Sequence, residues 1–295
     1  MAEPKVSIII LNWNGLKDTI ECLESLKKIT YPNYEVIVVD NDSTHNEAGE
    51  IQERYPEVRL IKNSANEGFC RGNNIGAKVA LKNNPDYLLF LNNDTIVKTN
   101  FLEELIKFTE TNPRVGVAGP LVFYYDEPNK VYSCGGKLNL WLCSTYTYRF
   151  IPKMPLKNLD SVSTALLIRA DLIKKIGLWD EDFFTYWEDT DYGLRTKKAG
   201  FYVACVGSSI IYHKVARATK YLSPRYIYFM VRNNLLIAKK HAKFYQWPSI
   251  LINFFLRRWL GYFLKLLLLK NYSAIPAIFW GTWDFVINNY GRGRY

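Results

Sequence analysis

Val6-Ser7-Ile8-Ile9-Ile10-Leu11-Asn12-Trp13-Asn14-Gly15 lies near the start of this 295-residue chain. An unbroken aliphatic run of this length is typical of a strand that is buried on both faces, and Asn14-Gly15 predicts the turn that ends it. Apolar side chains then recur at helical spacing, at Leu16, Ile20, Leu23 and Leu26. The stretch therefore predicts a strand followed directly by a helix, which is the first unit of an α/β fold.

The same alternation continues through the first half of the chain. We expect buried strands at 35–39, 58–61 and 87–91, with helices near 47–55 and 70–81. Strands that alternate with helices imply right-handed crossovers and a mostly parallel sheet flanked by helices. Residues 111–160 are expected to be irregular. Beyond them the pattern predicts a strand at 161–168, a short helix at 171–176, and two strands at 201–206 and 210–213.

Polar residues collect where three of the predicted strands end. Asn12 ends the first, Asp40 and Asp42 follow the second, and Asn93 and Asp94 follow the fourth. In open α/β sheets the ligand crevice lies outside the carboxyl ends of the strands, so these side chains are expected to share a site. Each of them could also be a helix cap or a turn residue, because Asn and Asp are common there.

A cluster of carboxylates stands in the segment Phe184-Thr185-Tyr186-Trp187-Glu188-Asp189-Thr190-Asp191-Tyr192-Gly193-Leu194-Arg195. Adjacent carboxylates repel, so such a cluster beside aromatic residues suggests a charged partner, a metal or a catalytic role. The alternative is a solvated first turn of a helix, where the helix dipole favours acids. Asp191 is placed to cap that helix or to pair with Arg195 four residues on.

Charge is distributed unevenly along the chain. Residues 1–213 hold 24 Lys and Arg against 27 acids, whereas residues 214–295 hold 14 Lys and Arg against the single acid Asp284. The sequence therefore predicts an α/β domain at 1–220 and a basic helical extension at 221–295. The five cysteines form no C-x-x-C pair, and the apolar run near the N-terminus is too short for a signal peptide, which fits a cytoplasmic protein with reduced thiols.

The extension is expected to bind the inner face of the cell membrane. Residues 247–269 are strongly apolar but carry Arg257, Arg258 and Lys265, and each such charge would cost roughly 2.5–3.5 kcal/mol at the centre of a bilayer. A basic helix with Trp, Phe and Leu on its other face lies in the membrane interface instead. Packing of that face on the body is the alternative. Nucleic acid is disfavoured as a partner, because the apolar runs do not suit a stacking groove.

Five motifs stand in order along the chain, at residues 6–14, 38–43, 66–76, 91–95 and 187–191. Together they resemble the family 2 glycosyltransferases, and most of all their rhamnosyltransferase-like and galactofuranosyltransferase-like members. The resemblance implies a GT-A nucleotide-sugar-binding fold, which is Rossmann-like, and transfer with inversion from a nucleoside-diphosphate donor to a glycolipid or surface polysaccharide. It favours dTDP-rhamnose or a UDP-sugar as the donor.

The resemblance also implies a role for individual residues. Asp189 would be the general base, with Trp187 and Glu188 binding the acceptor. Asn92-Asn93-Asp94 matches the acidic motif that binds the metal, but its first acid is replaced by an amide. Asp94 and His213 would therefore hold a divalent cation, Mg²⁺ or Mn²⁺, together with the diphosphate. The donor would be bound by Asn12, Asp40, Asp42, Arg71, Asn74 and Asn93.

Three other functions compete with this interpretation. A dehydrogenase would need G-x-G-x-x-G after the first strand, and the chain has none. A sugar nucleotidyltransferase would need a Gly-rich basic loop at the same place, where Asn12-Trp13-Asn14-Gly15 stands. A non-catalytic membrane-associated homologue would not need to keep Asp94, Asp189 and His213.

Overall fold

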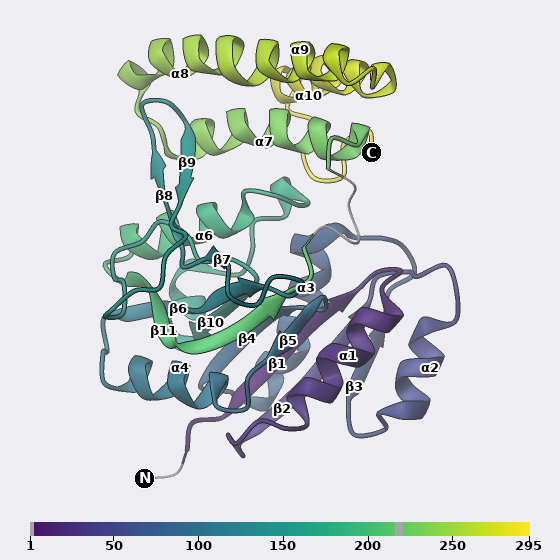
Figure 1. The fold of residues 1–295 in the computed structure, drawn as a ribbon, viewed down its shortest axis with the longest axis vertical. Coiled ribbons are helices and arrows are strands. Elements are labelled where there is room, and N and C mark those ends of the chain that lie inside the picture. The colour runs from purple at the N-terminus through teal and green to yellow at the C-terminus, as the bar shows by residue number, and fades with distance from the viewer. Residues whose placement is uncertain (1–2, 216–220) are drawn as a thin grey trace.

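The computed structural model describes residues 3–215 and 221–295. Figure 1 shows a body built on one curved sheet and a separate layer of helices above it. The sheet begins with four parallel strands, whose order in space is β3-β2-β1-β4. Their bounds are β1 (Val6–Asn12), β2 (Tyr34–Asp40), β3 (Arg59–Lys62) and β4 (Tyr87–Asn92).

The second half of the sheet is mixed. Beyond β4 the order continues β10-β6-β11-β5, and β7 pairs with β6. β6 and β11 run in the same direction as the first four strands, whereas β10, β5 and β7 run against them, so the expected mostly parallel α/β fold is confirmed. The bounds are β5 (Thr95–Val97), β6 (Val115–Tyr124), β7 (Val131–Ser133), β10 (Ala165–Arg169) and β11 (Tyr202–His213).

Two of the strand predictions were wrong in detail. Residues 111–160 are not irregular throughout, since β6 is a long buried strand within them. Its Gly116, Gly119 and Pro120 are poor strand formers, but Gly119 lets the Val162 side chain pack against the backbone, where a Cβ would come within 2.7 Å. The two strands expected at 201–206 and 210–213 are one strand, β11, with a register shift between Val206 and Ile210.

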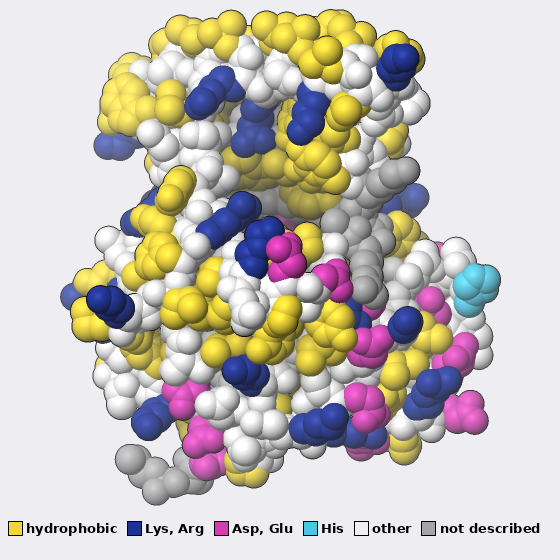
Figure 2. Space-filling model, in the orientation of Figure 1, with side chains coloured by type: hydrophobic (Ala, Val, Ile, Leu, Met, Phe, Trp, Pro, Cys, Tyr) yellow, Lys and Arg dark blue, Asp and Glu magenta, His cyan; other side chains and the backbone are white. Residues whose placement is uncertain are grey.

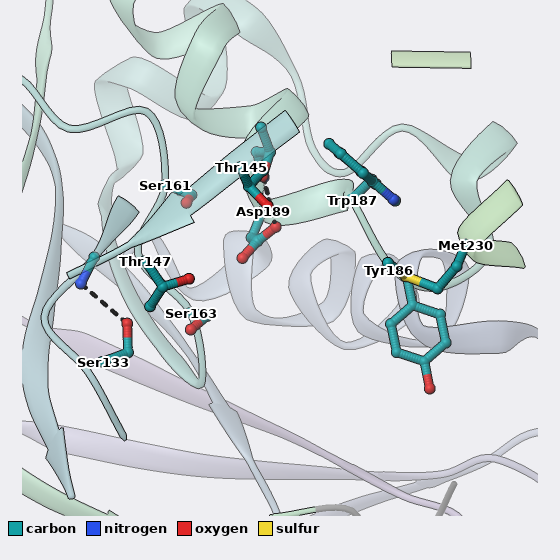
Figure 3. A pocket seen from close by; sticks show the side chains of 11 residues that line it. Ser133, Thr145, Thr147, Ser161, Ser163, Tyr186, Trp187, Asp189 and Met230 are labelled. Carbon is teal, nitrogen blue, oxygen red and sulfur yellow. Dashed lines mark hydrogen bonds between the residues drawn. The ribbon is translucent and has the colours of Figure 1, made fainter. Parts of the chain in front are cut away.

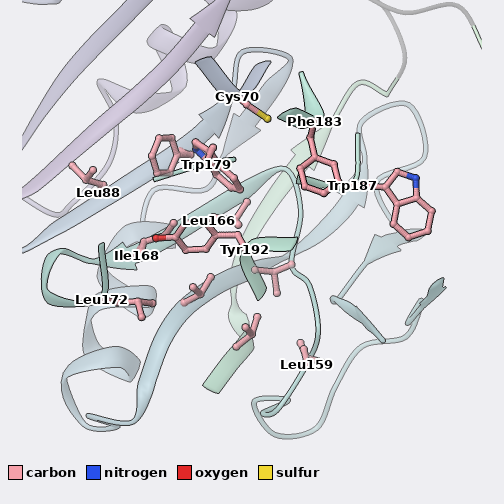
Figure 4. Packing of buried hydrophobic residues seen from close by; sticks show 14 of the residues in the cluster. Cys70, Leu88, Leu159, Leu166, Ile168, Leu172, Trp179, Phe183, Trp187 and Tyr192 are labelled. Atoms are coloured by element: carbon pink, nitrogen blue, oxygen red, sulfur yellow. The ribbon is translucent and has the colours of Figure 1, made fainter. Parts of the chain in front are cut away.

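Helices cover both faces of the sheet and enclose two apolar cores. Leu23 of α1, Ile51 of α2 and Leu105 of α4 belong to one core, and Ala77 of α3 and Tyr192 of α6 belong to the other. Figure 4 shows the second core, where the Trp179 ring lies 5.0 Å from both Phe90 and Tyr192. The bounds are α1 (Leu16–Leu26), α2 (Glu47–Arg54), α3 (Gly68–Ala80), α4 (Phe101–Glu110), α5 (Ala170–Ile176) and α6 (Glu188–Lys198).

The basic extension forms the helical layer. Its inner helix is α7 (Pro224–His241), and its outer rim is a continuous run of α8 (Trp247–Asn253), the π-helical η4 (Phe254–Trp259) and α9 (Leu260–Leu268). α10 (Ile275–Val286) packs on α7. The expected domain boundary at residue 220 falls in 216–220, outside the described residues.

A hairpin of β8 (Gly136–Asn139) and β9 (Ser144–Thr147) rises from the body to this layer (Figure 1). Its tip is tied there by hydrogen bonds. The Asn234 amide donates to the Cys143 carbonyl at 2.7 Å, and the Ser249 hydroxyl donates to the Trp141 carbonyl at 2.7 Å. The hairpin therefore links the two parts of the molecule.

Candidate active site

Three of the predicted donor residues belong to one hydrogen-bonded network at the carboxyl end of β1. The Asn12 amide, which is buried, donates to Asp40 at 2.9 Å and to Glu47 at 2.8 Å. The Thr19 hydroxyl donates to Asn12 Oδ1 at 2.7 Å and accepts from the Asn93 amide at 2.9 Å. The parallel register brings Asn12 beside Asp40. Glu47 and Thr19 were not predicted. Each lies in a helix, and the sequence pattern does not indicate that its side chain reaches Asn12.

The other predicted donor residues are not part of this network: Asp42 follows β2, and Arg71 and Asn74 lie in α3. Asp42 is exposed and has a left-handed backbone with φ of 63°. Arg71 pairs with Glu67 at 3.2 Å and keeps more than half of its side chain exposed. Asn74 is buried, and its amide donates to the Trp179 carbonyl and to Glu181 at 2.9 Å each. Asn74 thereby ties α3 to the segment that leads to the acid cluster.

The two predicted metal ligands lie side by side. Pairing of β11 with β5 sets His213 opposite Thr95, and His213 Nε2 is 3.1 Å from Asp94 Oδ1. A carboxylate oxygen and an imidazole nitrogen this close to each other could both bind one divalent cation whose remaining ligands are diphosphate oxygens. Within 3–215 and 221–295, no group of three His, Cys, Asp or Glu side chains forms a metal cluster by itself. The protein can thus supply two ligands here.

The acid cluster follows a strained loop. Phe184, Tyr186 and Trp187 all have left-handed backbones, with φ of 59°, 65° and 75°. Such conformations cost about 1–3 kcal/mol each in residues other than glycine and persist only where neighbouring groups fix them. The Asn233 amide of α7 donates to the carbonyls of Phe183, Thr185 and Tyr186 at 2.8, 2.8 and 3.0 Å. A buried side chain of the helical layer thus holds the loop that precedes the acids.

The three acids of the cluster have different surroundings. Burial raises the pKa of Asp191, but the hydrogen bond to His241 and the charge of Arg195 outweigh it, and the pKa is lowered. Both partners are 2.7 Å away, so Asp191 joins α6 to the end of α7. The sequence pattern anticipated the Arg195 pair, but not His241, which is 50 residues distant in the chain.

Glu188 and Asp189 are adjacent buried acids at the start of α6. Burial, followed by repulsion from Asp189, raises the pKa of Glu188 to about 8, so this carboxyl is protonated at neutral pH. Its Oε2 is buried without a hydrogen-bond partner among the described residues. Burial also raises the pKa of Asp189, which makes it a better proton acceptor. Asp189 Oδ1 accepts from the backbone N–H of Thr190 at 2.6 Å and from the Thr190 hydroxyl at 3.2 Å.

Asp189 and Trp187 line a cavity of about 160 Å³ between the body, the hairpin and α7. Figure 3 shows the Asp189 carboxyl group facing hydroxyl side chains across this cavity. Glu188, which was expected beside Trp187 at the acceptor, is not one of its lining residues. The lining residues are Ser133, Gly135, Thr145, Thr147, Ser161, Ser163, Tyr186, Trp187, Asp189, Thr190 and Met230.

Comparison with known proteins identifies the family of the chain. The model of "Glycosyl transferase family 2" matches residues 7–177, more than half of the chain. The chain is a family 2 glycosyltransferase. The expected family is confirmed, and the dehydrogenase, nucleotidyltransferase and non-catalytic interpretations are set aside.

Relatives of the transferase include named rhamnosyltransferases. It is 23% identical to the dTDP-rhamnosyl transferase RfbF of Shigella flexneri over 79% of each chain. It is 27% identical to the N-acetylglucosaminyl-diphospho-decaprenol L-rhamnosyltransferase of Mycobacterium tuberculosis over 67% of this chain and 72% of that one. The O-antigen biosynthesis protein RfbC of Myxococcus xanthus is 28% identical over 72% of the transferase, which spans only 18% of RfbC.

Solved structures share the fold of the transferase. Staphylococcus aureus TarS 1–349 in complex with UDP-GlcNAc has a TM-score of 0.62 at 18% identity, over 96% of this chain and 80% of that one. GalNAc-T7 with UDP, GalNAc and Mn²⁺ has a TM-score of 0.62 at 17% identity, over 78% of this chain and 47% of that one. At these identities the likeness shows a common fold, here GT-A.

Proposed function

We propose that the transferase moves one sugar, with inversion, from a nucleoside-diphosphate donor to a hydroxyl of a lipid-linked or polysaccharide acceptor. The observation that carries this proposal is the setting of Asp189. Its Oδ1 is held by Thr190, its pKa is raised, and its carboxyl group faces a cavity walled by hydroxyls. A single displacement needs one base that takes the acceptor proton as the new bond forms, and Asp189 would be that base.

The donor would lie in the crevice at the ends of β1, β2 and β4. Asp40, which is buried and accepts hydrogen bonds from Asn12 and Ser43, would accept a further one from a base N–H or a ribose hydroxyl, and Arg71 would supply an exposed positive charge. Asp94 and His213 would hold Mg²⁺ or Mn²⁺, which stabilises the negative charge of the departing diphosphate. The relatives named as dTDP-rhamnosyl or rhamnosyl transferases favour dTDP-rhamnose, and the UDP-bound neighbours keep a UDP-sugar as the other candidate.

The helical layer would rest on the inner face of the cell membrane, where a lipid-linked acceptor is presented. The outer rim exposes large apolar side chains, among them Leu256 at 61% and Leu268 at 83% (Figure 2). The single acid of the extension, Asp284, is buried and paired with Arg294, so the charges that the described part of the layer exposes are positive. Within the described residues no helix is long and apolar enough to cross a bilayer. This combination supports interfacial binding to anionic lipid.

Thermal shifts with UDP, dTDP and GDP, each with and without Mn²⁺, test the donor site. The correct base should raise the melting temperature most, since binding to the native state adds RT ln(1 + [L]/Kd) to stability. Asp94→Ala and His213→Ala should each abolish the Mn²⁺-dependent part of the shift and leave the metal-free part. Asp171→Ala, an exposed acid on α5, is the matched control. Equal shifts for all three bases would overturn the donor assignment, and an unchanged Mn²⁺ effect in both variants would overturn the metal assignment.

A further inference from the structure

The exposed face of α10 and the end of η4 form an apolar groove in the helical layer. Its volume is about 340 Å³, which is the size of a small-ligand site. Of the six described residues that line it, only Thr282 carries a hydroxyl group, and that hydroxyl already donates to the Ile278 carbonyl at 2.9 Å. The groove therefore suits a hydrocarbon chain better than a glycan or a peptide, whose many polar groups would lack partners there. The lining residues are Trp259, Phe279, Trp280, Thr282, Trp283 and Val286.

Ring contacts fix the walls of the groove. The Trp259 ring stacks on Phe263 with centroids 5.8 Å apart and meets Phe279 edge-on at 5.0 Å. The Arg294 guanidinium covers the Trp280 ring at 4.4 Å. Although the walls are held in this way, Phe279, Trp280 and Trp283 each remain about half exposed. A preformed apolar surface of this kind marks a site of interaction with an apolar ligand.

The π-helical segment η4 connects the groove with the active site. Trp259 lines the groove, and the residue before it, Arg258, has its guanidinium 5.0 Å from the Trp187 ring. Trp187 in turn lines the cavity beside Asp189. Two adjacent residues of one helix thus contact the two sites, and π-helical turns occur frequently at functional sites.

Between the two sites lie two polar groups that suit an anion. Trp187 Nε1 is buried without a hydrogen-bond partner among the described residues, and Figure 3 shows it at the end of the indole ring away from Asp189. The single acid of the extension, Asp284, is buried and paired with Arg294, so no acid of the extension neutralises Arg258. Figure 2 shows further Lys and Arg side chains on the layer, above the hollow that separates it from the body. An N–H donor beside a guanidinium is a suitable pair for phosphate oxygens.

We propose that the groove takes the hydrocarbon chain of a lipid-phosphate acceptor, with the phosphate bound by Arg258 and Trp187 and the rest of the molecule directed to the cavity beside Asp189. This rests on the proposed transfer reaction and selects a lipid-linked acceptor over a free polysaccharide. A free polysaccharide would leave the groove and both polar groups without a ligand. The chain of the acceptor leaves the bilayer to enter the groove, so the layer binds one lipid molecule in addition to the membrane surface.

The test is titration of the full-length transferase with geranylgeranyl phosphate, below its critical micelle concentration and without divalent cation. Geranylgeraniol, which lacks the phosphate, and inorganic phosphate, which lacks the chain, separate the two contributions. Isothermal titration calorimetry should show binding of geranylgeranyl phosphate, weaker binding of geranylgeraniol and no measurable binding of inorganic phosphate.

Two variants assign these contributions to residues. Trp283→Ala removes one wall of the groove and should weaken both lipids at least about tenfold, the effect of losing one large apolar contact. Arg258→Gln should weaken geranylgeranyl phosphate by about tenfold or more and leave geranylgeraniol unchanged, because it removes only the bond to the charged phosphate. Trp141→Ala is the matched control. Its side chain lies at the hairpin tip with the same 53% exposure as Trp283, and both lipids should bind to this variant as to the wild type.

Failure of the groove and failure of the transfer reaction give different results. If no nucleoside diphosphate shifts the melting temperature, the proposed function itself fails. If a nucleoside diphosphate binds but geranylgeranyl phosphate does not, or if Trp283→Ala binds it like the wild type, the groove assignment is overturned. It is overturned as well if dioctanoyl phosphatidylglycerol binds as tightly and displaces geranylgeranyl phosphate, because the groove then takes bilayer lipid. Conversion of a dimer to a monomer by Trp283→Ala with unchanged lipid affinity would also overturn it, since the groove would then be a contact between two copies.

Discussion

At the scale of single residues, the chain places three acids within four positions and gives each a different environment. Asp191 is hydrogen-bonded to Arg195 and His241, Glu188 is buried and its pKa is raised, and Asp189 faces the cavity. The sequence indicated a functional cluster because adjacent carboxylates repel one another, which suggests a charged partner, a metal or a catalytic role. It could not distinguish the three environments, because His241 and the cavity wall come from segments far away in the chain.

The raised pKa of Glu188 predicts a specific dependence of stability on pH. The pKa rises from an ordinary value of 4.5 to about 8 on folding, so its contribution to stability is complete below pH 4.5 and is lost as pH rises to about 8. Glu188→Gln removes this loss. From pH 5.5 to pH 8.5 the wild type should therefore lose at least about 1 kcal/mol of unfolding free energy more than the variant, since one pKa unit corresponds to 1.36 kcal/mol. Urea titrations at both pH values measure it, and parallel losses would contradict the assignment.

At the scale of elements, α7 has polar residues whose partners the sequence does not show. Its polar residues Arg232, Asn233 and Asn234 interrupt an apolar helix, and all three are buried. Arg232 donates to the carbonyls of Asp182 and Gly291 at 3.1 and 2.8 Å. Polar residues within an apolar helix could have indicated buried hydrogen bonds. Their partners could not be predicted, because most of them are backbone carbonyls, which a sequence pattern does not identify.

Asn233 is therefore expected to position the catalytic loop. Asn233→Ala removes the side-chain donor of the Thr185 and Tyr186 carbonyls and one of the donors of the Phe183 carbonyl, which should lower the unfolding free energy by about 1–3 kcal/mol. Relaxation of the strained loop should also displace Asp189, and a displacement of about 1 Å can cost on the order of 10²-fold in rate. The expected result is a lower kcat with unchanged nucleoside-diphosphate affinity, while the exposed Asn100→Ala behaves like the wild type. A loss of stability with full kcat would leave Asn233 as a structural residue alone.

The strands show which parts of the sheet a local sequence pattern can predict and which it cannot. β1, β2 and β4 were predicted closely, because buried parallel strands are continuous aliphatic runs. β6 was missed, since glycine and proline interrupt it and its place in the sheet depends on close packing with Val162. The polar residues proposed for the donor follow predicted strands, whereas four of the residues that line the cavity beside Asp189 come from the region in which no strand was expected.

At the scale of the whole molecule, the helical layer and the body are not independent. α7 holds the catalytic loop, η4 contacts Trp187, and the hairpin is tied to α7 and α8. Removing the extension would therefore disturb the active site as well as any membrane contact, so a truncated chain cannot test membrane binding by itself. Substitutions on the outer rim separate the two effects.

The membrane proposal predicts that the outer rim controls vesicle binding. The wild type should sediment with phosphatidylglycerol vesicles, less so as salt rises and less with phosphatidylcholine, because each Lys or Arg near an anionic surface contributes about 1 kcal/mol. Leu256→Gln combined with Leu268→Gln should weaken sedimentation. Ile151→Gln, at an equally exposed apolar side chain of the body, should not. Wild type that stays in the supernatant at low salt would contradict the proposal and leave the rim as a protein contact.

The central claim is that Asp189 is the base of a sugar transfer, and Asp189→Asn tests it most directly. The amide keeps the size of the side chain but cannot take the acceptor proton. We expect single-turnover transfer from the donor identified by thermal shift to fall roughly 10²–10⁴-fold, with the nucleoside-diphosphate affinity measured on the same protein unchanged. Transfer at near wild-type rate by Asp189→Asn, with donor binding intact, would contradict the account.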